Sequence, residues 1–453
     1  MMLPLALTLL TTLAASTEPL HYGLFGDLHV ARPEKTERTL LFLSDADGWN
    51  AREESYADAL AGTGALVVGI DLPAYLKELY SIKSKCAYPA AHVEEVSHWV
   101  QRHENLPDYA APLLVGLDAG ASFAYAVAAQ APAGTFASLV TLGYDFEFHL
   151  QQPLCPGDAG LASAASGPHR YRIVPVPHMP APWLPLPFAS DTRINGLPAH
   201  LLRVAPLLGA LHPRHHAERA APAALVASLE RWQRREARRV KPLPQDVADL
   251  PLTDIAPDGD FKQRVAIVLT GDGGWAGLDQ GVAAALAAQG VRVIGLSTLK
   301  FFWQTRKPEE AAEAVARIIG HYSAEFPDAR FALIGYSFGA SLAPVVVNRL
   351  PDEARAKLDA QFMISPDDEA VFEIKVGDWF GNAKHEGALP IAPELATSKV
   401  PAFCIHGMDE DDSVCRTLDT KSATPLQLPG GHHYDGDYEG LGKLVATHWP
   451  VTR

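Results

Sequence analysis

The chain has 453 residues, of which 48% are hydrophobic and 20% charged, and its formal net charge at pH 7 is −15. This composition is typical of a folded globular protein, and the length exceeds what one ordinary domain needs. Because nucleic-acid binding requires a basic surface, the negative charge argues against nucleic acid as a partner, but it does not exclude lipid headgroups that carry positive charge.

Residues 1–16 predict an export signal. Residues 2–16 are almost wholly apolar or small and end in Ala14-Ala15-Ser16, which suits a signal-peptidase site. The run is too short to span a bilayer, and no cysteine follows it that could carry a lipid anchor. The usual basic residues before the apolar run are absent, and the alternative is an amino-terminal core segment. We therefore expect a signal peptide over 1–16 and no integral membrane span.

The rest of the chain contains an internal duplication. Residues 39–49 are similar to 265–275, residues 65–71 to 291–297, and residues 113–122 to 331–341. Strand-like apolar runs alternate with helical spacing in both copies, which predicts an α/β fold. We expect two tandem α/β-hydrolase-like units, each with a mostly parallel sheet and flanking helices. The proline-rich, acidic segment 241–260 is the expected linker between a first unit at 17–240 and a second at 261–453.

The four cysteines fall two in each half of the chain. An even number together with an export signal predicts disulfides, Cys86–Cys155 and Cys404–Cys415, the second of which would restrain an acidic loop. The alternative is four reduced, buried thiols. The sequence has neither C-x-x-C nor H-E-x-x-H, so no metal site and no cofactor are predicted.

The second unit begins with alternating elements, predicted as strand 264–270, helix 278–289, strand 291–297, helix 308–326 and strand 330–336. A glycine-rich loop, 271–275, follows the first strand, where α/β-hydrolases place a backbone N–H donor for an oxyanion. Gly273, Gly274 or Trp275 would supply it, with Asp272, Trp275 and Tyr336 as candidate substrate contacts. A phosphate-binding loop is the alternative, but G-K-[ST] and G-x-G-x-x-G are absent. The aromatic run 301–303 is expected in the core rather than against lipid.

The most informative motif is Gly335-Tyr-Ser337-Phe-Gly339, which lies between a predicted strand and a predicted helix. This G-x-S-x-G pattern is typical of a nucleophile elbow, whose tight turn leaves no room for side chains at the two glycines. Ser337 is the predicted nucleophile. The backbone N–H of Phe338, at the start of the helix, is the predicted oxyanion donor.

An acid and a histidine follow in the order expected of an α/β-hydrolase. A predicted strand ending at Gly407 leads to four consecutive carboxylates, 409–412, and a second predicted strand leads to Gly430-Gly431-His432-His433. His432 is the preferred base because it directly follows the glycine pair, and His433 is the alternative. Among the carboxylates Asp412 is preferred as the acid of the triad, with Asp411 and Glu410 as close rivals; at least two of the four are expected in solvent.

The first copy has Asp118 where the second has Ser337. Asp191 and His215 lie downstream as candidate partners of Asp118, but the first copy has no histidine framed by glycines as His432 is in the second. An aspartate can act as a nucleophile in principle. We expect instead a unit that has lost its catalytic residues but retains its fold.

The motifs of the second unit together resemble the VirJ/AcvB bacterial virulence family. They are the 269–275 loop, Phe302-Trp303 with Pro308, the elbow 335–340, the loop between Cys404 and Cys415, and residues 430–438. With its amino-terminal half the chain is similar to the long, AcvB-like form. The resemblance implies a periplasmic serine hydrolase of aminoacyl-phosphatidylglycerol, chiefly the lysyl form. It also implies a link to the export of virulence substrates, and it aligns the catalytic residues with Ser337, the 410–412 cluster and His432.

Two other functions remain open from the sequence. One is a general carboxylesterase or thioesterase with a small acyl pocket. The other is a non-catalytic periplasmic scaffold in type IV secretion and virulence, in which the serine is vestigial.

Overall fold

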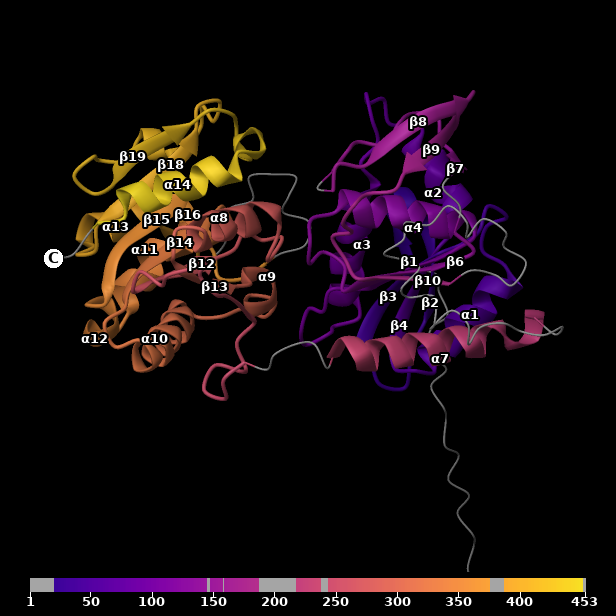
Figure 1. Ribbon diagram of the computed structural model, residues 1–453, viewed down its shortest axis with the longest axis horizontal. Helices are drawn as coiled ribbons and strands as arrows, with labels where there is room; N and C mark the ends of the chain where they lie inside the picture. Colours follow the sequence, from indigo (N-terminus) through magenta and orange to yellow (C-terminus); the bar gives the residue numbers. More distant parts are fainter. Residues whose placement is uncertain are drawn as a thin grey trace, which may run out of the picture.

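The computed structural model describes residues 20–144, 147–157, 159–186, 217–237, 243–374 and 387–450. The expected signal peptide, 1–16, and the residues Asp191 and His215 lie outside these ranges. Within them the chain forms two α/β units side by side, the first in indigo to magenta and the second in orange to yellow (Figure 1). A search of the described helices finds none that is both long and apolar enough to cross a membrane.

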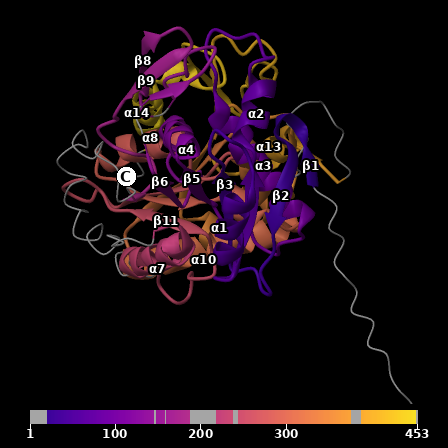
Figure 2. The same cartoon turned by 90° about the vertical axis from the view of Figure 1, so that its right-hand side faces the viewer.

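The first unit is built on a seven-stranded sheet with the order β1-β2-β4-β3-β5-β6-β10. Its strands are β1 (Leu20–Tyr22), β2 (Gly26–Ala31), β3 (Arg38–Leu43), β4 (Ala65–Ile70), β5 (Leu113–Leu117), β6 (Ser138–Leu142) and β10 (Trp183–Leu186). The flanking helices are α1 (Ala51–Ala61), α2 (Leu72–Leu79), α3 (Pro89–His103), α4 (Ala119–Gln130) and α7 (Ala217–Ala237). A smaller antiparallel sheet of β7 (Glu147–His149), β9 (Arg170–Val174) and β8 (Ala162–Gly167) rises above it in Figure 2.

The second unit repeats this plan in the order β11-β13-β12-β14-β15-β18-β19. Its strands are β11 (Leu252–Ile255), β12 (Arg264–Leu269), β13 (Arg292–Leu296), β14 (Arg330–Tyr336), β15 (Leu358–Ile364), β18 (Ala402–Gly407) and β19 (Thr424–Leu428), with the short pair β16 (Glu369–Ala370) and β17 (Leu389–Pro390). Its helices are α8 (Gly277–Ala287), α9 (Thr298–Phe301), α10 (Pro308–Glu325), α11 (Phe338–Arg349), α12 (Asp352–Arg355), α13 (Ile391–Thr397) and α14 (Tyr438–His448).

The predicted tandem α/β fold is confirmed. The two sheets also share an order of strands, so the duplication includes strands outside the three pairs of similar sequence segments. The parallel run β4-β3-β5-β6 corresponds to β13-β12-β14-β15, and an antiparallel strand, β2 or β11, borders each run on the same side. The strands and helices predicted between 264 and 336 all form within a few residues of their expected bounds. The short helix α9 was not predicted, because four residues are too few to show a helical period.

The expected linker, 241–260, needs correction. Residues 252–255 form β11, which pairs with β13 at the edge of the second sheet. Val247 and Leu250 lie buried in the core of the second unit. Two of the four prolines that suggested a linker, Pro251 and Pro257, flank this edge strand instead, where a missing N–H costs little. The second unit therefore begins before residue 261.

Corresponding glycines of the two units make the same close contacts. A Cβ atom at Gly69 would lie 2.1 Å from the ring of Trp49, and one at Gly295 would lie 2.0 Å from the ring of Trp275. In both units, therefore, a tryptophan from the loop after the first parallel strand covers a glycine of the neighbouring strand. This packing explains why both residues persist in both copies.

Both predicted disulfides form, Cys86–Cys155 and Cys404–Cys415, and no cysteine is free. The aromatic run 301–303 is buried, as expected for core residues. Its Trp303 also contacts the first unit, where its Nε1 donates to the carbonyl of Leu106 at 2.9 Å.

The elbow glycine Gly339 offers a test of this packing. A Cβ atom there would lie 2.3 Å from the carbonyl oxygen of Leu269, so Gly339→Ala should destabilise the second unit by about 2 kcal/mol or more. Gly320→Ala is the matched control, because a Cβ atom in the middle of α10 would meet nothing within 4 Å. The control should stabilise the protein by about 0.5–1 kcal/mol. Thermal unfolding followed by circular dichroism compares the two, and equal midpoints for both variants would contradict the contact.

Candidate active site

Ser337 lies at the sharp turn between β14 and α11, as the motif predicted. Its backbone is in an unusual region, φ 50° and ψ −116°, and its N–H donates to the carbonyl of Ile364 at 2.8 Å. A non-glycine residue at positive φ is strained, and here the close approach of Gly335 and Gly339 fixes it. Asp118 of the first unit has nearly the same angles, φ 50° and ψ −107°. The elbow is thus present in both units with different side chains.

His432 joins the nucleophile to an acid. Its Nε2 lies 3.2 Å from Oγ of Ser337, and its Nδ1 lies 2.8 Å from Oε1 of Glu410. Because a carboxylate only accepts, the proton belongs on Nδ1, and Nε2 is left to accept the hydroxyl proton of Ser337. The loops that carry the two partners are tightly packed, since a Cβ atom at Gly407 would lie 2.3 Å from the carbonyl oxygen of Gly430. The imidazole can therefore act as a general base towards Ser337.

The acid beside His432 is Glu410, which corrects the preference for Asp412. Glu410 is half-buried, whereas Asp409, Asp411 and Asp412 are exposed to solvent. A 3-10 turn at 414–416 and the disulfide to Cys404 draw the chain back towards β18 after residue 413. The loop is thus not extended at the carboxylates, and side-chain alternation along an extended segment did not apply.

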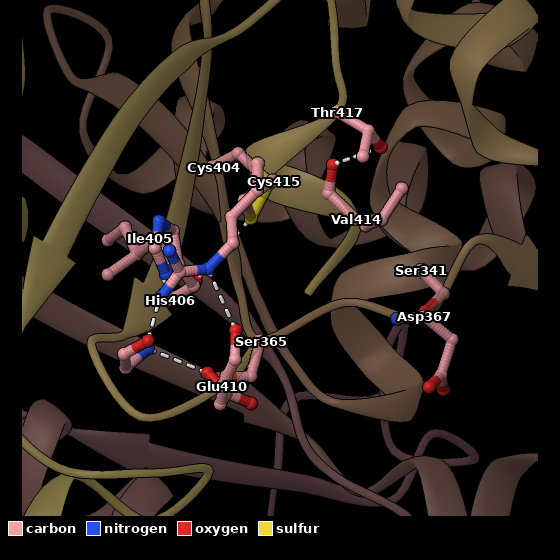
Figure 3. The surroundings of a disulfide bond; sticks show 12 residues. Ser341, Ser365, Asp367, Cys404, Ile405, His406, Glu410, Val414, Cys415 and Thr417 are labelled. Atoms are coloured by element: carbon pink, nitrogen blue, oxygen red, sulfur yellow. Dashed lines mark hydrogen bonds between the residues drawn. A yellow bond between two sulfur atoms is a disulfide. The ribbon is translucent and has the colours of Figure 1, made fainter. Parts of the chain in front are cut away.

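Glu410 is held by more than the histidine. The N–H of Gly407 donates to its Oε2 at 2.6 Å and the hydroxyl of Ser365 donates to the same atom at 2.8 Å. Burial alone would raise the pKa of Glu410, but these bonds and His432 outweigh it and hold the pKa below its usual value. Figure 3 shows Glu410 beside Ser365, with the disulfide Cys404–Cys415 at the base of the same loop. The acid is therefore ionised and fixed in place.

His433 and Tyr336 form a second pair behind the first. The phenol oxygen of Tyr336 lies 3.0 Å from Nδ1 of His433 and 3.4 Å from the carbonyl oxygen of His432. Burial raises the pKa of Tyr336 well above its usual range, so the phenol is neutral. Tyr336 was predicted to contact substrate, but its buried side chain supports the histidine loop instead. Trp275, the other aromatic candidate, has its ring packed over Gly295 rather than at Ser337.

The first unit shows where an oxyanion would bind in the second. In the first unit the carboxylate of Asp45 accepts from the N–H of Ala46 at 2.6 Å and from the N–H of Ala119 at 3.1 Å. In the second unit Gly271 aligns with Asp45. Asp272 aligns with the donor Ala46, and Phe338 aligns with the donor Ala119. Gly271 has no side chain, so no carboxylate at position 271 accepts from these two N–H groups; the N–H groups of Asp272 and Gly273 interact with the Asp272 carboxylate itself.

The candidate donor Gly274 does not fit this role. Its N–H donates to the carbonyl of Gly271 at 3.0 Å, which closes the turn of the loop. The hydroxyl of Thr298, at the start of α9, donates to the same carbonyl at 2.6 Å and so also holds the loop in place. Gly273 remains on the loop, and a Cβ atom there would meet nothing within 4 Å. The aligned position from the first unit favours the N–H of Asp272 over that of Gly273.

Several carboxylates surround the triad. Asp272 and Asp367 both interact with His432, and burial, the largest effect, raises the pKa of each. Behind them Asp279 is 2% exposed, and burial raises its pKa to about 8. The described residues include no group of three or more His, Cys, Asp or Glu side chains placed to hold a metal ion.

The sequence did not single out Ser365, Asp367 or Asp279. Ser365 and Asp367 follow β15, the strand next to the elbow strand, and the carboxyl ends of parallel strands meet at one edge of a sheet. Their place near Ser337 could therefore be predicted only from the pairing of β15 with β14, which the sequence alone did not give. Asp279 lies on the first turn of α8, where its Oδ2 accepts from the N–H of Ala276 at 3.5 Å.

Glu410→Gln should remove the orienting carboxylate while preserving the shape of the loop. We expect the rate at which a fluorophosphonate labels Ser337 to fall about 10³-fold, because the amide can present an N–H to Nδ1 and stabilise the wrong tautomer. Asp412→Asn is the control, with the same change of charge on an exposed side chain, and should label within about twofold of the unmodified protein. Equal labelling of the two variants would show that Glu410 does not act through His432.

Comparison with known proteins shows which family the second unit is similar to. The family model described as "Bacterial virulence protein (VirJ)" matches residues 263–452. No curated protein matches the chain. Similar solved structures include an alpha-beta serine hydrolase homologue from Coxiella burnetii, at 15% identity and TM-score 0.32, covering 44% of this chain and 91% of that one. Est1E from Butyrivibrio proteoclasticus follows at 13% identity and TM-score 0.33, covering 43% and 91%. Residues 263–452 therefore match the VirJ family model, and the resemblance read from the motifs of the second unit is confirmed for these residues.

Proposed function

We propose that this protein is a serine hydrolase that cleaves the aminoacyl ester of aminoacyl-phosphatidylglycerol, in its lysyl or alanyl form. The observation that carries the proposal is the line from Ser337 through His432 to Glu410, with distances of 3.2 and 2.8 Å. A serine, a histidine and a carboxylate in this geometry form the general machinery of acyl transfer. The match of the second unit to the VirJ family supports the lipid substrate, through the resemblance stated from its motifs.

The reaction proceeds in two stages. Oγ of Ser337 attacks the ester carbonyl while Nε2 of His432 takes its proton, and Glu410 stabilises the resulting imidazolium. The N–H groups of Phe338 and Asp272 hold the oxyanion. His432 then gives the proton to the departing glycerol oxygen of the lipid, which leaves an aminoacyl ester on Ser337. In the second stage water attacks that ester with His432 again as base, and the free amino acid and Ser337 are released.

The charge around the site favours a cationic acyl group. Asp272 and Asp367 lie near His432, and in the described part of the chain neither forms an ion pair with a lysine or arginine. Removing a carboxylate from water without a counter-charge is costly, and a bound ammonium would offset that cost. An aminoacyl ester carries such an ammonium next to its carbonyl carbon. A simple carboxylester or thioester carries none.

We also propose that the first unit is not a hydrolase. Asp118 replaces the serine and accepts from Nη2 of Arg52 at 3.0 Å. Asp45 occupies the two N–H groups that would hold an oxyanion. An arginine-paired carboxylate is a poor nucleophile, and an oxyanion would have to displace another anion.

The disulfides support a periplasmic location. Disulfides persist in oxidising compartments such as the periplasm and are rare in the cytosol. The structure contains Cys86–Cys155 in the first unit and Cys404–Cys415 in the second. Together with the expected export signal, they favour a protein that acts at the periplasmic face of a membrane, where a lipid headgroup is accessible.

Ser337→Ala tests the proposed function directly. In a strain that lacks the wild-type gene, lipid extracts should show aminoacylated phosphatidylglycerol accumulating with the variant and not with the unmodified protein. Purified Ser337→Ala should lose roughly 10⁴-fold or more in kcat on the same lipid. If the variant restores every phenotype of the deletion, the protein is a scaffold. If purified protein cleaves nitrophenyl esters far faster than aminoacyl lipids, it is a general esterase.

Gly271→Asp tests the oxyanion site by copying the first unit into the second. The new carboxylate should take the N–H groups of Asp272 and Phe338, as Asp45 does with their counterparts, and reduce kcat by about 10²-fold or more. Gly273→Asp adds the same charge where a Cβ atom meets nothing within 4 Å, and the first unit has Asp47 at the aligned position; Gly271→Ala controls for packing, because its Cβ atom would lie 3.1 Å from the ring of Tyr336. Steady-state kinetics on an aminoacyl ester should show the loss in the first variant only; comparable losses in both would count against the proposed pocket.

A further inference from the structure

Several hydrogen bonds join the two units of the chain. Nη2 of Arg102, on α3, donates to the carbonyl of Ile374 at 2.6 Å, and Nε1 of Trp303 donates to the carbonyl of Leu106 at 2.9 Å. Figure 1 shows α8 and α9 on the side of the second unit that faces the first. One residue at this junction, Gln280 of α8, also bonds to the loop that follows β12.

Gln280 bridges the first unit and the end of the glycine-rich loop 271–275. Its Nε2 lies 2.7 Å from the carbonyl oxygen of Ala133 and 3.0 Å from that of Trp275. A carbonyl oxygen only accepts, so both contacts require the nitrogen of the side-chain amide, whose two hydrogens suffice for them. The backbone N–H of Gln280 donates to the carbonyl of Ala276 at 2.9 Å, which fixes the point from which the side chain extends. One amide therefore ties the two units together at this loop.

Gly134 of the first unit lies against the same carbonyl. A Cβ atom at Gly134 would lie 3.0 Å from the carbonyl oxygen of Trp275. Gly134 has φ 93°, in the left-handed region that favours glycine. It follows α4, the helix that begins directly after the elbow residue Asp118. The turn after α4 thus approaches the glycine-rich loop with its backbone, more closely than a side chain would allow.

The two ends of the glycine-rich loop are held by different units. At its start, the hydroxyl of Thr298 donates to the carbonyl of Gly271 at 2.6 Å, within the second unit. At its end, the ring of Trp275 packs in the second unit, but its carbonyl is tied through Gln280 to the first. The proposed oxyanion donor, the N–H of Asp272, lies between these two points. Because a donor displaced by about 1 Å loses much of its effect on a transition state, the position of both ends matters.

We propose that Gln280 is a positioning residue for the active site, through which the first unit holds the glycine-rich loop in the geometry that presents the N–H of Asp272 to the oxyanion. The inference rests on the proposed function, since it assumes an oxyanion formed by attack of Ser337. Gln280 acts through the loop rather than on the reacting atoms. The negative charge develops on the oxygen only in the transition state, so the contact contributes to kcat rather than to KM.

Gln280→Met tests the bridge from the second unit. Methionine has nearly the same length but no N–H donor, so kcat on an aminoacyl ester should fall about tenfold while KM changes less than about twofold. Gln304→Met is the matched control. Nε2 of Gln304 also donates to a carbonyl of the first unit, that of Pro107, at 2.9 Å, but this bond does not involve the glycine-rich loop. Both variants lose a hydrogen bond between the units, so similar thermal midpoints with different kcat values would support the bridge.

Gly134→Ala tests the same contact from the first unit. The added methyl group would press on the carbonyl of Trp275, so kcat should again fall, by about threefold or more, with little change in KM. Gly160→Ala is the matched control, because Gly160 also has a positive φ, 66°, but a Cβ atom there would meet nothing within 4 Å. Both variants strain the backbone of the first unit, and only the first should alter catalysis by the second. Equal kcat values for the two would contradict the contact.

A double variant separates positioning of the oxyanion donor from general loosening of the structure. Gly271→Asp fills the proposed oxyanion site, so in that background Gln280→Met should lower kcat by less than about twofold further. If the two losses multiply instead, Gln280 does not act through the oxyanion donors and the inference is wrong.

The outcomes distinguish this inference from the proposed function. If the unmodified protein cleaves no aminoacyl ester while a fluorophosphonate still labels Ser337, the proposed substrate is wrong. The difference between Gln280→Met and Gln304→Met should then appear in the labelling rate, because phosphonylation also places charge on an oxygen at the oxyanion site; equal labelling rates would overturn the role of Gln280. If the ester is cleaved and the two variants have the same kcat, the proposed function stands and the role of Gln280 is overturned.

Discussion

The close packing of the elbow turn against the end of β12 is the constraint on which the rest of the site depends. Gly335 and Gly339 bring the backbone of α11 against that of β14 and the carbonyls of Leu269 and Thr270, with no room for a Cβ atom at either position. This approach holds Ser337 at positive φ and leaves its hydroxyl at the carboxyl edge of the sheet. It also brings the first N–H of α11 beside the loop after β12. The positions of Ser337 and of the proposed oxyanion donor Phe338 therefore follow from one piece of backbone geometry.

The two units show that packing and chemistry can separate after duplication. The first unit keeps the paired elbow glycines, the tryptophan over a strand glycine, and the positive φ of the elbow residue. What differs is the side chains at the elbow and at the loop beside it. Asp118 stands where the second unit has Ser337, Asp45 where it has Gly271, and Leu72 where it has Thr298. Since the shared packing residues do not depend on these side chains, both units keep the same fold with different groups at the elbow.

The first unit contacts the second through helix α3 and the residues just after it. Arg102 donates to the carbonyl of Ile374 at 2.6 Å, and its guanidinium lies 3.9 Å from the centroid of the Trp303 ring. The ring of Tyr109 lies 5.2 Å from that of Trp303. This contact therefore uses packing residues of the second unit and leaves Ser337, His432 and Glu410 untouched.

The sequence by itself determined the duplicated α/β fold, the elbow turn at Ser337, the histidine that meets it, His432, and both disulfide pairings. Each of these follows from a local pattern: an apolar period, a glycine-framed turn, or an even set of cysteines. Only the tertiary structure decided that Glu410, rather than Asp412, meets the histidine, because a turn and a disulfide after residue 413 redirect the loop. The same holds for β11 inside the expected linker and for the packing of Tyr336 against the histidine loop and of Trp275 over Gly295. Which side chains meet across distant segments depends on how strands align and units dock, and no local pattern records this.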